Sequence, residues 1–149
     1  MEADDLLGIA QSASLKASTM DNPGTIICSI DKDLDQIPGW HYNFVDEKRY
    51  WIGEYDGLHN FYKQLICGDT TDNIVGIPGK GSALSSKVLF YYELPEREAE
   101  LQKVILDLYE KAYPGAGLAA MIENGRLVKI LTEPLEEDLS NLWRPIYVV

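Results

Sequence analysis

The sequence predicts an α/β fold in two parts, in which helices and a few parallel strands come first and only helices follow. Two observations predict this division. Residues 25–30 form one short β-branched apolar run, which is typical of a buried strand in a parallel sheet. From residue 56 onward, the apolar residues recur at the spacing of amphipathic helices. The predicted parts are therefore residues 1–55 and 56–149.

The N-terminal part begins with a helix from Glu2 to about Ser18. The acids at its start suit the positive end of the helix dipole. The strand Thr25–Ile30 comes next, and Trp40–Phe44 and Arg49–Ile52 then predict a β-hairpin over a polar turn. The first helix carries an apolar stripe that we expect to be buried, formed by Leu6, Leu7, Ala10, Ala13 and Ala17.

The C-terminal part begins with a helix for which Asp56 is the expected N-cap. The loop Thr70–Gly81 separates this helix from a second one, about Ser82–Tyr92. The first helix has one apolar face that we expect to be buried, formed by Leu58, Phe61, Tyr62, Leu65 and Ile66.

Two further helices complete the predicted fold. Pro95 fits the first turn of one helix, whose apolar stripe extends to Ala112. The other covers about Leu118–Leu131 and is weakened by Asn124–Gly125. This part of the sequence contains no strand signal.

The composition is that of an ordinary globular protein, 46% hydrophobic and 25% charged. No apolar run approaches the ~18 residues of a membrane span, and the acidic start is unlike a signal peptide. These observations predict a cytoplasmic protein. Cys28 and Cys67 have neither metal-type spacing nor a disulfide framework, so we expect buried free thiols.

The net charge of −11 argues against a simple nucleic-acid-binding protein, because such proteins are normally basic. Two bound divalent cations would still leave the chain acidic. Any DNA contact must therefore depend on local geometry and metal, or on basic residues of another chain or segment.

Acids are concentrated in three short segments, Glu2–Asp5, Asp31–Asp33 and Asp69–Asp72. In the first and third, acids three residues apart would share a helical face, and in the second they would share one side of an extended backbone. Oxygen-only ligands favour Mg²⁺ or Mn²⁺, and the absence of neighbouring His or Cys disfavours zinc. The candidate metal ligands are Glu2, Asp4, Asp5, Asp31, Asp33, Asp69 and Asp72.

Each acidic segment also has an ordinary structural interpretation. Acids at a helix start usually balance the helix dipole, and Asp69 suits an N-cap. The spacing of Asp31, Asp33 and Asp35 imitates an EF-hand loop, but Gln36 stands at its glycine position and Tyr42 at its closing glutamate. The combination of three acidic segments with the following glycine loop favours metal binding.

The segment Gly76–Gly81 is a glycine-rich loop, and Ser82 begins the next predicted helix. Glycines permit positive φ and close approach of the backbone, and N–H groups at a helix start can bind a phosphate oxygen. A simple turn between two helices is the alternative. The segment is not a Walker loop, because the Gly-Lys-Ser/Thr ending is absent.

Three ordered segments, Glu2–Asp5, Ser29–Gln36 and Gly68–Gly81, resemble the 5′-nuclease (flap endonuclease-like) superfamily. They are most similar to bacteriophage 5′–3′ exonucleases and to the 5′-nuclease domain of bacterial DNA polymerase I. The resemblance covers residues 1–92 in detail. It implies part of a PIN-like core, followed by a helical lobe whose helix–three-turn–helix element spans about residues 60–92.

The resemblance implies that two Mg²⁺ or Mn²⁺ ions support phosphodiester hydrolysis, with Asp4, Asp31 and Asp33 as catalytic residues and Glu2 among the direct metal ligands. Asp5, Asp69 and Asp72 would then hold the second ion or its waters. It also implies K⁺ in the hairpin. The residues expected to contact DNA are Gly76, Gly79, Lys80, Gly81 and Ser82.

The sequence departs from the family pattern in two respects. Lys80 stands where an apolar residue is usual, and Ser82 and Ala83 stand where Pro and Lys are frequent. The family's N-terminal strand and basic helical arch have no counterpart before Glu2, so the chain resembles the C-terminal part of such a nuclease. We expect weak metal binding and poor cleavage by this chain alone, and recovery when the missing segment is supplied.

The function implied is that of a magnesium-dependent 5′–3′ exonuclease or flap endonuclease in DNA replication, in the cytoplasm of a bacterium or a phage-infected host. Its partner would be duplex DNA with a 5′ end, a nick or a flap. The alternatives are a non-catalytic duplex-DNA-binding module and an acidic metal-binding or protein-interaction domain. The nuclease hypothesis requires the three acidic segments to meet beside the glycine loop.

Overall fold

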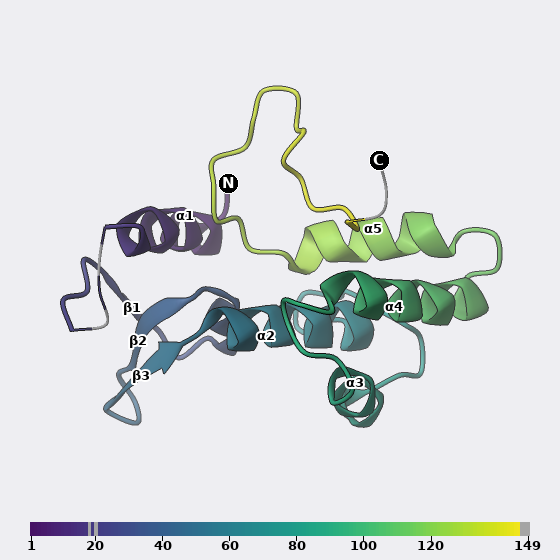
Figure 1. The fold of residues 1–149 in the computed structure, drawn as a ribbon, viewed down its shortest axis with the longest axis horizontal. Coiled ribbons are helices and arrows are strands. Elements are labelled where there is room, and N and C mark those ends of the chain that lie inside the picture. Colours follow the sequence, from purple (N-terminus) through teal and green to yellow (C-terminus); the bar gives the residue numbers. More distant parts are fainter. Residues whose placement is uncertain (18, 20, 147–149) are drawn as a thin grey trace. The chain divides into compact units, whose positions relative to one another are not determined.

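The computed structural model describes residues 1–17, 19 and 21–146, and within them the chain is a mixed α/β protein with five α-helices and one three-stranded sheet. The chain forms two compact units. Unit 1 comprises residues 1–60 and 130–141, and unit 2 comprises residues 61–129 and 142–149 (Figure 1). The division falls within helix α2 (Glu54–Cys67).

The sheet belongs to unit 1 and contains β1 (Ile26–Cys28), β2 (Gly39–Asn43) and β3 (Lys48–Ile52), in that order. β1 runs parallel to β2, and β2 and β3 form the antiparallel hairpin that the sequence predicts. Asn43 stabilises the turn at residues 44–47, because its Oδ1 accepts two backbone N–H groups at 2.9 and 3.0 Å.

Strand β1 is shorter and less buried than predicted. Ile27 is 3% exposed, whereas Ile26 is 39% exposed and Cys28 is also exposed. The prediction of a buried Cys28 thiol is therefore wrong. Cys67 is half-buried, and both cysteines are free. The run looks buried in the sequence because its residues are β-branched, but β1 lies at an edge of the described sheet and packs through one face.

The core of unit 1 brings residues 27–37 together with residue 130, far along the sequence. Ile27, Leu34, Ile37 and Ile130 form one buried apolar cluster. Leu34 lies in η1 (residues 32–36), a short 3₁₀ helix. The backbone N–H of Ile130 donates to Oε1 of the buried Gln36, in η1, at 3.3 Å.

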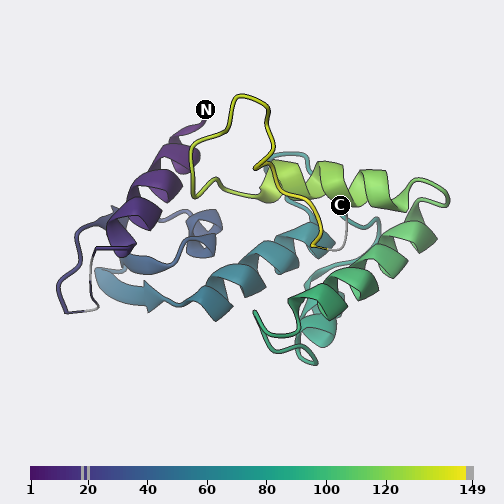
Figure 2. The same ribbon diagram turned by 45° about the horizontal axis from the view of Figure 1, so that its top comes forward.

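Helix α1 (Ala3–Leu15) lies beside β1 and β2 (Figure 2), but it does not bury the predicted apolar stripe. Leu6 and Leu7 are 58% and 39% exposed. The buried positions include Gly8, where an added Cβ would lie 2.3 Å from the carbonyl oxygen of Leu131. This close backbone approach decides which face of α1 turns inward, so the prediction from apolar spacing is wrong.

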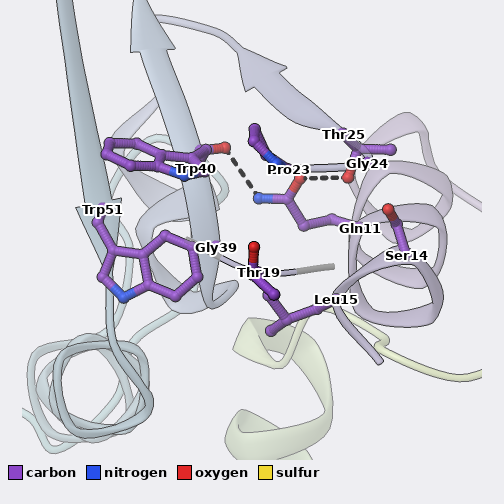
Figure 3. A pocket seen from close by; sticks show the side chains of 10 residues that line it. All are labelled: Gln11, Ser14, Leu15, Thr19, Pro23, Gly24, Thr25, Gly39, Trp40 and Trp51. Atoms are coloured by element: carbon purple, nitrogen blue, oxygen red, sulfur yellow. Dashed lines mark hydrogen bonds between the residues drawn. The ribbon is translucent and has the colours of Figure 1, made fainter. Parts of the chain in front are cut away.

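Gln11 is the polar residue that α1 buries (Figure 3). Its Nε2 donates to the Trp40 carbonyl at 2.9 Å, and its Oε1 accepts from Thr25 Oγ1 at 2.7 Å. The neighbouring pocket beside Trp40 and Trp51 has a volume of about 10 Å³, which is the space of a single water molecule. Ser18, the predicted end of the helix, lies outside the described residues.

Unit 2 contains the C-terminal half of α2 together with α3 (Ser82–Leu89), α4 (Glu98–Ala112) and α5 (Gly117–Val128). Helices α4 and α5 lie side by side and antiparallel (Figures 1 and 2). The core residues of this unit include most of the predicted α2 face: Phe61, Tyr62, Leu65, Ile66, Leu101, Ile105, Tyr109 and Met121.

Hydrogen bonds connect α2 to α4 inside this core. The Tyr109 hydroxyl donates to the Leu65 carbonyl at 2.6 Å. Gln102 Nε2 donates to the Tyr62 hydroxyl at 2.6 Å, and that hydroxyl donates to Glu98 at 2.5 Å. Every buried side-chain nitrogen and oxygen in the described chain has a hydrogen-bond partner, so the polar groups inside this apolar core are satisfied.

Several predicted helix ends differ from the structure. Asp56 lies in the first turn of α2 rather than at its N-cap, and α3 ends before Tyr92. Pro95 precedes α4, and α5 ends before Leu131. In the described part of the chain, no helix combines the length and the apolar character that a membrane span requires.

Candidate metal-binding and DNA-binding residues

The loop between α2 and α3 begins with a tight turn. Asp69 and Ile74 form an antiparallel bridge, with N–H···O distances of 2.8 and 2.7 Å in the two directions. Within the turn, Asp69 Oδ1 accepts the backbone N–H of Thr71 at 2.8 Å and of Asp72 at 3.4 Å. The expectation that Asp69 and Asp72 share a helical face is therefore wrong, because the backbone turns back on itself instead.

Both acids of this turn retain oxygen atoms for a cation. Asp69 is half-buried and uses Oδ1 for its two backbone contacts. Asp72 is exposed. A carboxylate that orients a turn with one oxygen keeps lone pairs on the other, and hard divalent cations accept such oxygens.

Two glycines hold the base of the loop together. Gly68 and Gly76 have φ of +72° and +63°. A Cβ on Gly76 would lie 2.3 Å from the backbone nitrogen of Gly68, so a larger residue does not fit there. Ile77 continues this attachment, because its side chain is 1% exposed and its N–H donates to the Ile66 carbonyl at 3.0 Å.

Helix α5 and the C-cap residue of α4, in the same unit, also hold Gly76. Asn124 Oδ1 accepts the Gly76 N–H at 2.9 Å, and the Tyr113 hydroxyl donates to the Gly76 carbonyl at 3.2 Å. Gly76 is buried, and both of its backbone groups are bonded to side chains. The structure therefore assigns Gly76, which was expected to contact DNA, a position at the base of the loop.

The tip of the loop, by contrast, is exposed from Gly79 to Ser82. Gly79 has φ +70°, and nothing lies within 4 Å of a Cβ built there or at Gly81. Gly81 is the N-cap of α3 and offers no side-chain oxygen to the first turn. The first backbone N–H groups of a helix have no intrahelical partner, so this tip presents donors to an incoming anion.

Two acids of the N-terminal segment, Glu2 and Asp5, make hydrogen bonds to the backbone of unit 1. Glu2 is the N-cap of α1 and forms a reciprocal capping box with Asp5. Asp5 Oδ2 accepts the Glu2 N–H at 3.4 Å, and Asp5 Oδ1 accepts the Leu131 N–H at 3.0 Å. Both oxygens of Asp5 thus bind backbone, while the neighbouring Asp4 is half-buried.

Asp31 and Asp33 lie at the start of η1. Asp31 caps this helix, because its Oδ1 accepts the Asp33 N–H at 2.9 Å. Its own N–H donates to Ser29 Oγ at 3.0 Å. The expectation of an extended backbone at Asp31–Asp33 is wrong, since the chain enters a 3₁₀ turn at this point.

The acids of unit 1 do not form a closed ligand set among themselves. Within the described residues of this unit, no three carboxylate, imidazole or thiol ligand atoms lie within 4.8 Å of one another. Glu2–Asp5 and Asp31–Asp33 are therefore not brought together as one compact group of three or more ligands within this unit.

A third acid, Asp35, lies at the opposite end of η1 and was not among the predicted site residues. Its Oδ1 accepts the Tyr50 hydroxyl at 2.8 Å and lies 4.0 Å from His41 Nδ1. The His41 ring stacks on Tyr50 with centroids 5.4 Å apart. Burial, together with Asp35, raises the pKa of Tyr50 to about 12, so its hydroxyl remains a donor at neutral pH.

A sequence signal for this cluster exists, although it is weak. His41 and Tyr50 are cross-strand partners in the predicted hairpin, so they share one face of the sheet. Comparison with known proteins adds no assignment to the residues above. No family model matches the chain, and neither a curated protein nor a solved structure matches it.

Proposed function

We propose that this chain carries the duplex-binding and metal-binding elements of a Mg²⁺- or Mn²⁺-dependent 5′ nuclease that hydrolyses DNA at a 5′ end, a nick or a flap. In this proposal, unit 1 belongs to a PIN-like core and unit 2 is a helix–three-turn–helix lobe. One observation carries it: the exposed tip Gly79–Ser82 stands at the start of α3, on a loop that also contains Asp69 and Asp72.

The tip has the properties of a phosphate-binding element. The missing Cβ atoms at Gly79 and Gly81 let a phosphate approach the backbone. The N–H groups at the start of α3 donate to a phosphate oxygen, and Lys80 adds a positive charge beside them. The whole chain carries a charge of −11, so few basic side chains are available to contact the phosphates. The binding of duplex through this tip should still weaken as salt is added, because it is a charge contact. A K⁺ ion in the loop belongs to the same proposal.

The oxygen donors fit a hard divalent cation. In unit 1, Asp31 uses one oxygen as a cap and keeps the other, and Asp33 follows it in η1. In unit 2, Asp69 and Asp72 offer the oxygens described above. We propose these residues as the metal ligands, with Asp4 as a further one. When bound, the cations supply the charge that stabilises the attacking and leaving oxygens of an in-line displacement.

The decisive test uses a 5′-labelled nicked or flapped duplex with Mn²⁺ or Mg²⁺. Poor cleavage is expected of this chain alone, so we expect it to release short 5′ products slowly and to lose this activity in chelator and in the Asp31→Asn variant. Asp46→Asn is the matched control, because Asp46 is an exposed acid in the hairpin turn of the same unit. Cleavage that survives both the chelator and Asp31→Asn would exclude the proposal.

A non-catalytic duplex-DNA-binding module is the second candidate. The capping contacts of Glu2, Asp5 and Asp31 favour it, because they give these acids roles that require no metal. This candidate predicts gel-shift binding to the duplex that is sensitive to salt, unaffected by Asp31→Asn, and never followed by cleavage. The nicked-duplex assay therefore separates the two functions on the same sample.

A further inference from the structure

Three consecutive residues in the second half of α5 hold two different segments of unit 2. Asn124 is 8% exposed, and its Oδ1 accepts the backbone N–H of Gly76, at the base of the glycine loop, at 2.9 Å. Gly125 and Arg126 contact the segment 142–146, which forms no helix or strand and which we call the strap. In Figures 1 and 2 the strap, drawn in yellow, returns to α5. One short stretch of helix therefore connects the strap to the loop.

The strap is attached to α5 through Trp143. Its indole ring lies directly against Gly125, because a Cβ added to this glycine would overlap the ring atoms Cε3 and Cζ3. The same ring makes an edge contact with Phe61 of α2, with centroids 5.3 Å apart. Arg126 Nε donates to the Trp143 carbonyl at 3.2 Å. The indole thus occupies a space that α5 leaves open only because residue 125 has no side chain.

The rest of the strap is bonded to α4. The backbone N–H of Ile146 donates to Oε1 of Gln102, a residue of α4 that is 1% exposed, at 2.7 Å. Pro145, immediately before it, is buried. The strap therefore contacts α2, α4 and α5 of the same unit, and it restrains the position of α5 against the other two helices.

We infer that Trp143 is a positioning residue, which acts through Gly125 and Asn124 to hold the glycine loop in the position from which its tip binds duplex DNA. Asn124 and Gly125 are neighbours in one helix, so a displacement of α5 at Gly125 also moves Asn124 away from the loop. A hydrogen bond weakens steeply as its distance and angle depart from the optimum. The inference rests on the proposed function only for the identity of the ligand, since the contacts themselves require none.

The test uses two variants of the full chain that displace the indole in different ways. Trp143→Ala removes the ring, and Gly125→Ala pushes it away while replacing glycine by a better helix former. In the ¹H–¹⁵N spectrum, both should move the Gly76 amide resonance towards its position in Asn124→Ala. Loss of stability alone would not move the resonance of the folded chain. Circular dichroism checks that each variant remains folded.

Both variants should also weaken duplex binding in a gel shift by about fivefold, the lower end of the usual coupling between two sites. Trp143→Phe keeps an aromatic ring on Gly125 and should recover most of this loss. Leu127→Ala is the matched control, because it removes a large apolar side chain from α5 that is 61% exposed. It should change neither the resonance nor the affinity.

A double variant tests the route through Asn124. In a chain that already carries Asn124→Ala, Trp143→Ala should weaken duplex binding by less than about a further twofold. A second full loss, or an unmoved Gly76 resonance in both Trp143→Ala and Gly125→Ala, would overturn the inference. A wild-type chain that binds no duplex would overturn the proposed function instead, and the Gly76 resonance would still decide whether Trp143 positions the loop.

Discussion

The side chain of Asn124 accepts a hydrogen bond from the backbone N–H of Gly76 at 2.9 Å, and thereby attaches helix α5 to the base of the glycine loop. We expect Asn124→Ala to lower the free energy of unfolding by about 2 kcal/mol, because a buried N–H loses its partner. It should also weaken binding of a duplex. Urea denaturation and a gel shift measure the two effects, with Glu123→Gln, an exposed neighbour on α5, as the control.

The loop offers a matched pair of glycine substitutions. Gly76→Ala places a Cβ 2.3 Å from the Gly68 nitrogen at φ +63°, so we expect a loss of about 2–4 kcal/mol in the free energy of unfolding. Gly79→Ala meets nothing within 4 Å and carries only the strain of φ +70°, about 1 kcal/mol. Thermal and urea denaturation of the two variants check this order. Equal stabilities would show that the base of the loop is not packed as described.

Lys80 should contribute to duplex binding through charge. Lys80→Ala removes one phosphate contact, so binding should weaken and the slope of log K against log salt should become shallower by about one. Lys87→Ala removes another exposed lysine, from the last turn of α3, and should change neither the affinity nor the slope. Gel shifts across a salt series measure both. Identical slopes for the two variants would mean that Lys80 only solubilises the loop.

Lys129 should destabilise unit 2 at neutral pH. Burial lowers the pKa of its ammonium group, with its Nζ 5.0 Å from the Phe61 ring and Glu98 opposing the shift. The pKa of Lys129 is therefore lower in the folded chain than in the unfolded chain. The resulting loss of folding stability is complete below the folded pKa and disappears as the pH rises towards the ordinary pKa of lysine.

Lys129→Met should therefore raise the free energy of unfolding most at pH 7. This gain should shrink as the pH approaches the pKa of a free lysine side chain. Urea denaturation at several pH values measures it. Lys111→Met, which replaces an exposed lysine on α4, should show no such trend. A loss of stability in Lys129→Met at pH 7 would instead show that the contact with Phe61 outweighs the cost of burial.

Periodic patterns predicted the elements that pack by their own side chains. The buried face of α2 with Phe61 and Leu65, the stripe of α4 with Leu101 and Ile105, and the β2–β3 hairpin all follow from spacing alone. Each of these segments repeats one apolar face over several turns or residues. The pattern is therefore local, and a single window of sequence contains it.

Contacts between distant segments could not be read from such windows. The spacing on α1 predicted that Leu6 is buried. Instead, Gly8 packs against the backbone of Leu131, and this contact decides which face of the helix is buried. Asn124 looked like a weak point in a helix, and it holds the glycine loop. Asp5 looked like a metal ligand, and both its oxygens bind backbone, one of them at Leu131.

The sequence by itself determined the order of helices and strands, the acidic segments, and the exposed glycine-rich tip, because these depend on composition and local spacing. Only the tertiary structure decided which acids cap helices, which retain oxygens for a cation, and that Asp35 is held by Tyr50. The physical reason is that a carboxylate takes the nearest suitable donor. Asp31 and Asp69 find that donor two residues away. For Asp5 and Asp35, a donor comes from far along the sequence, at Leu131 and Tyr50.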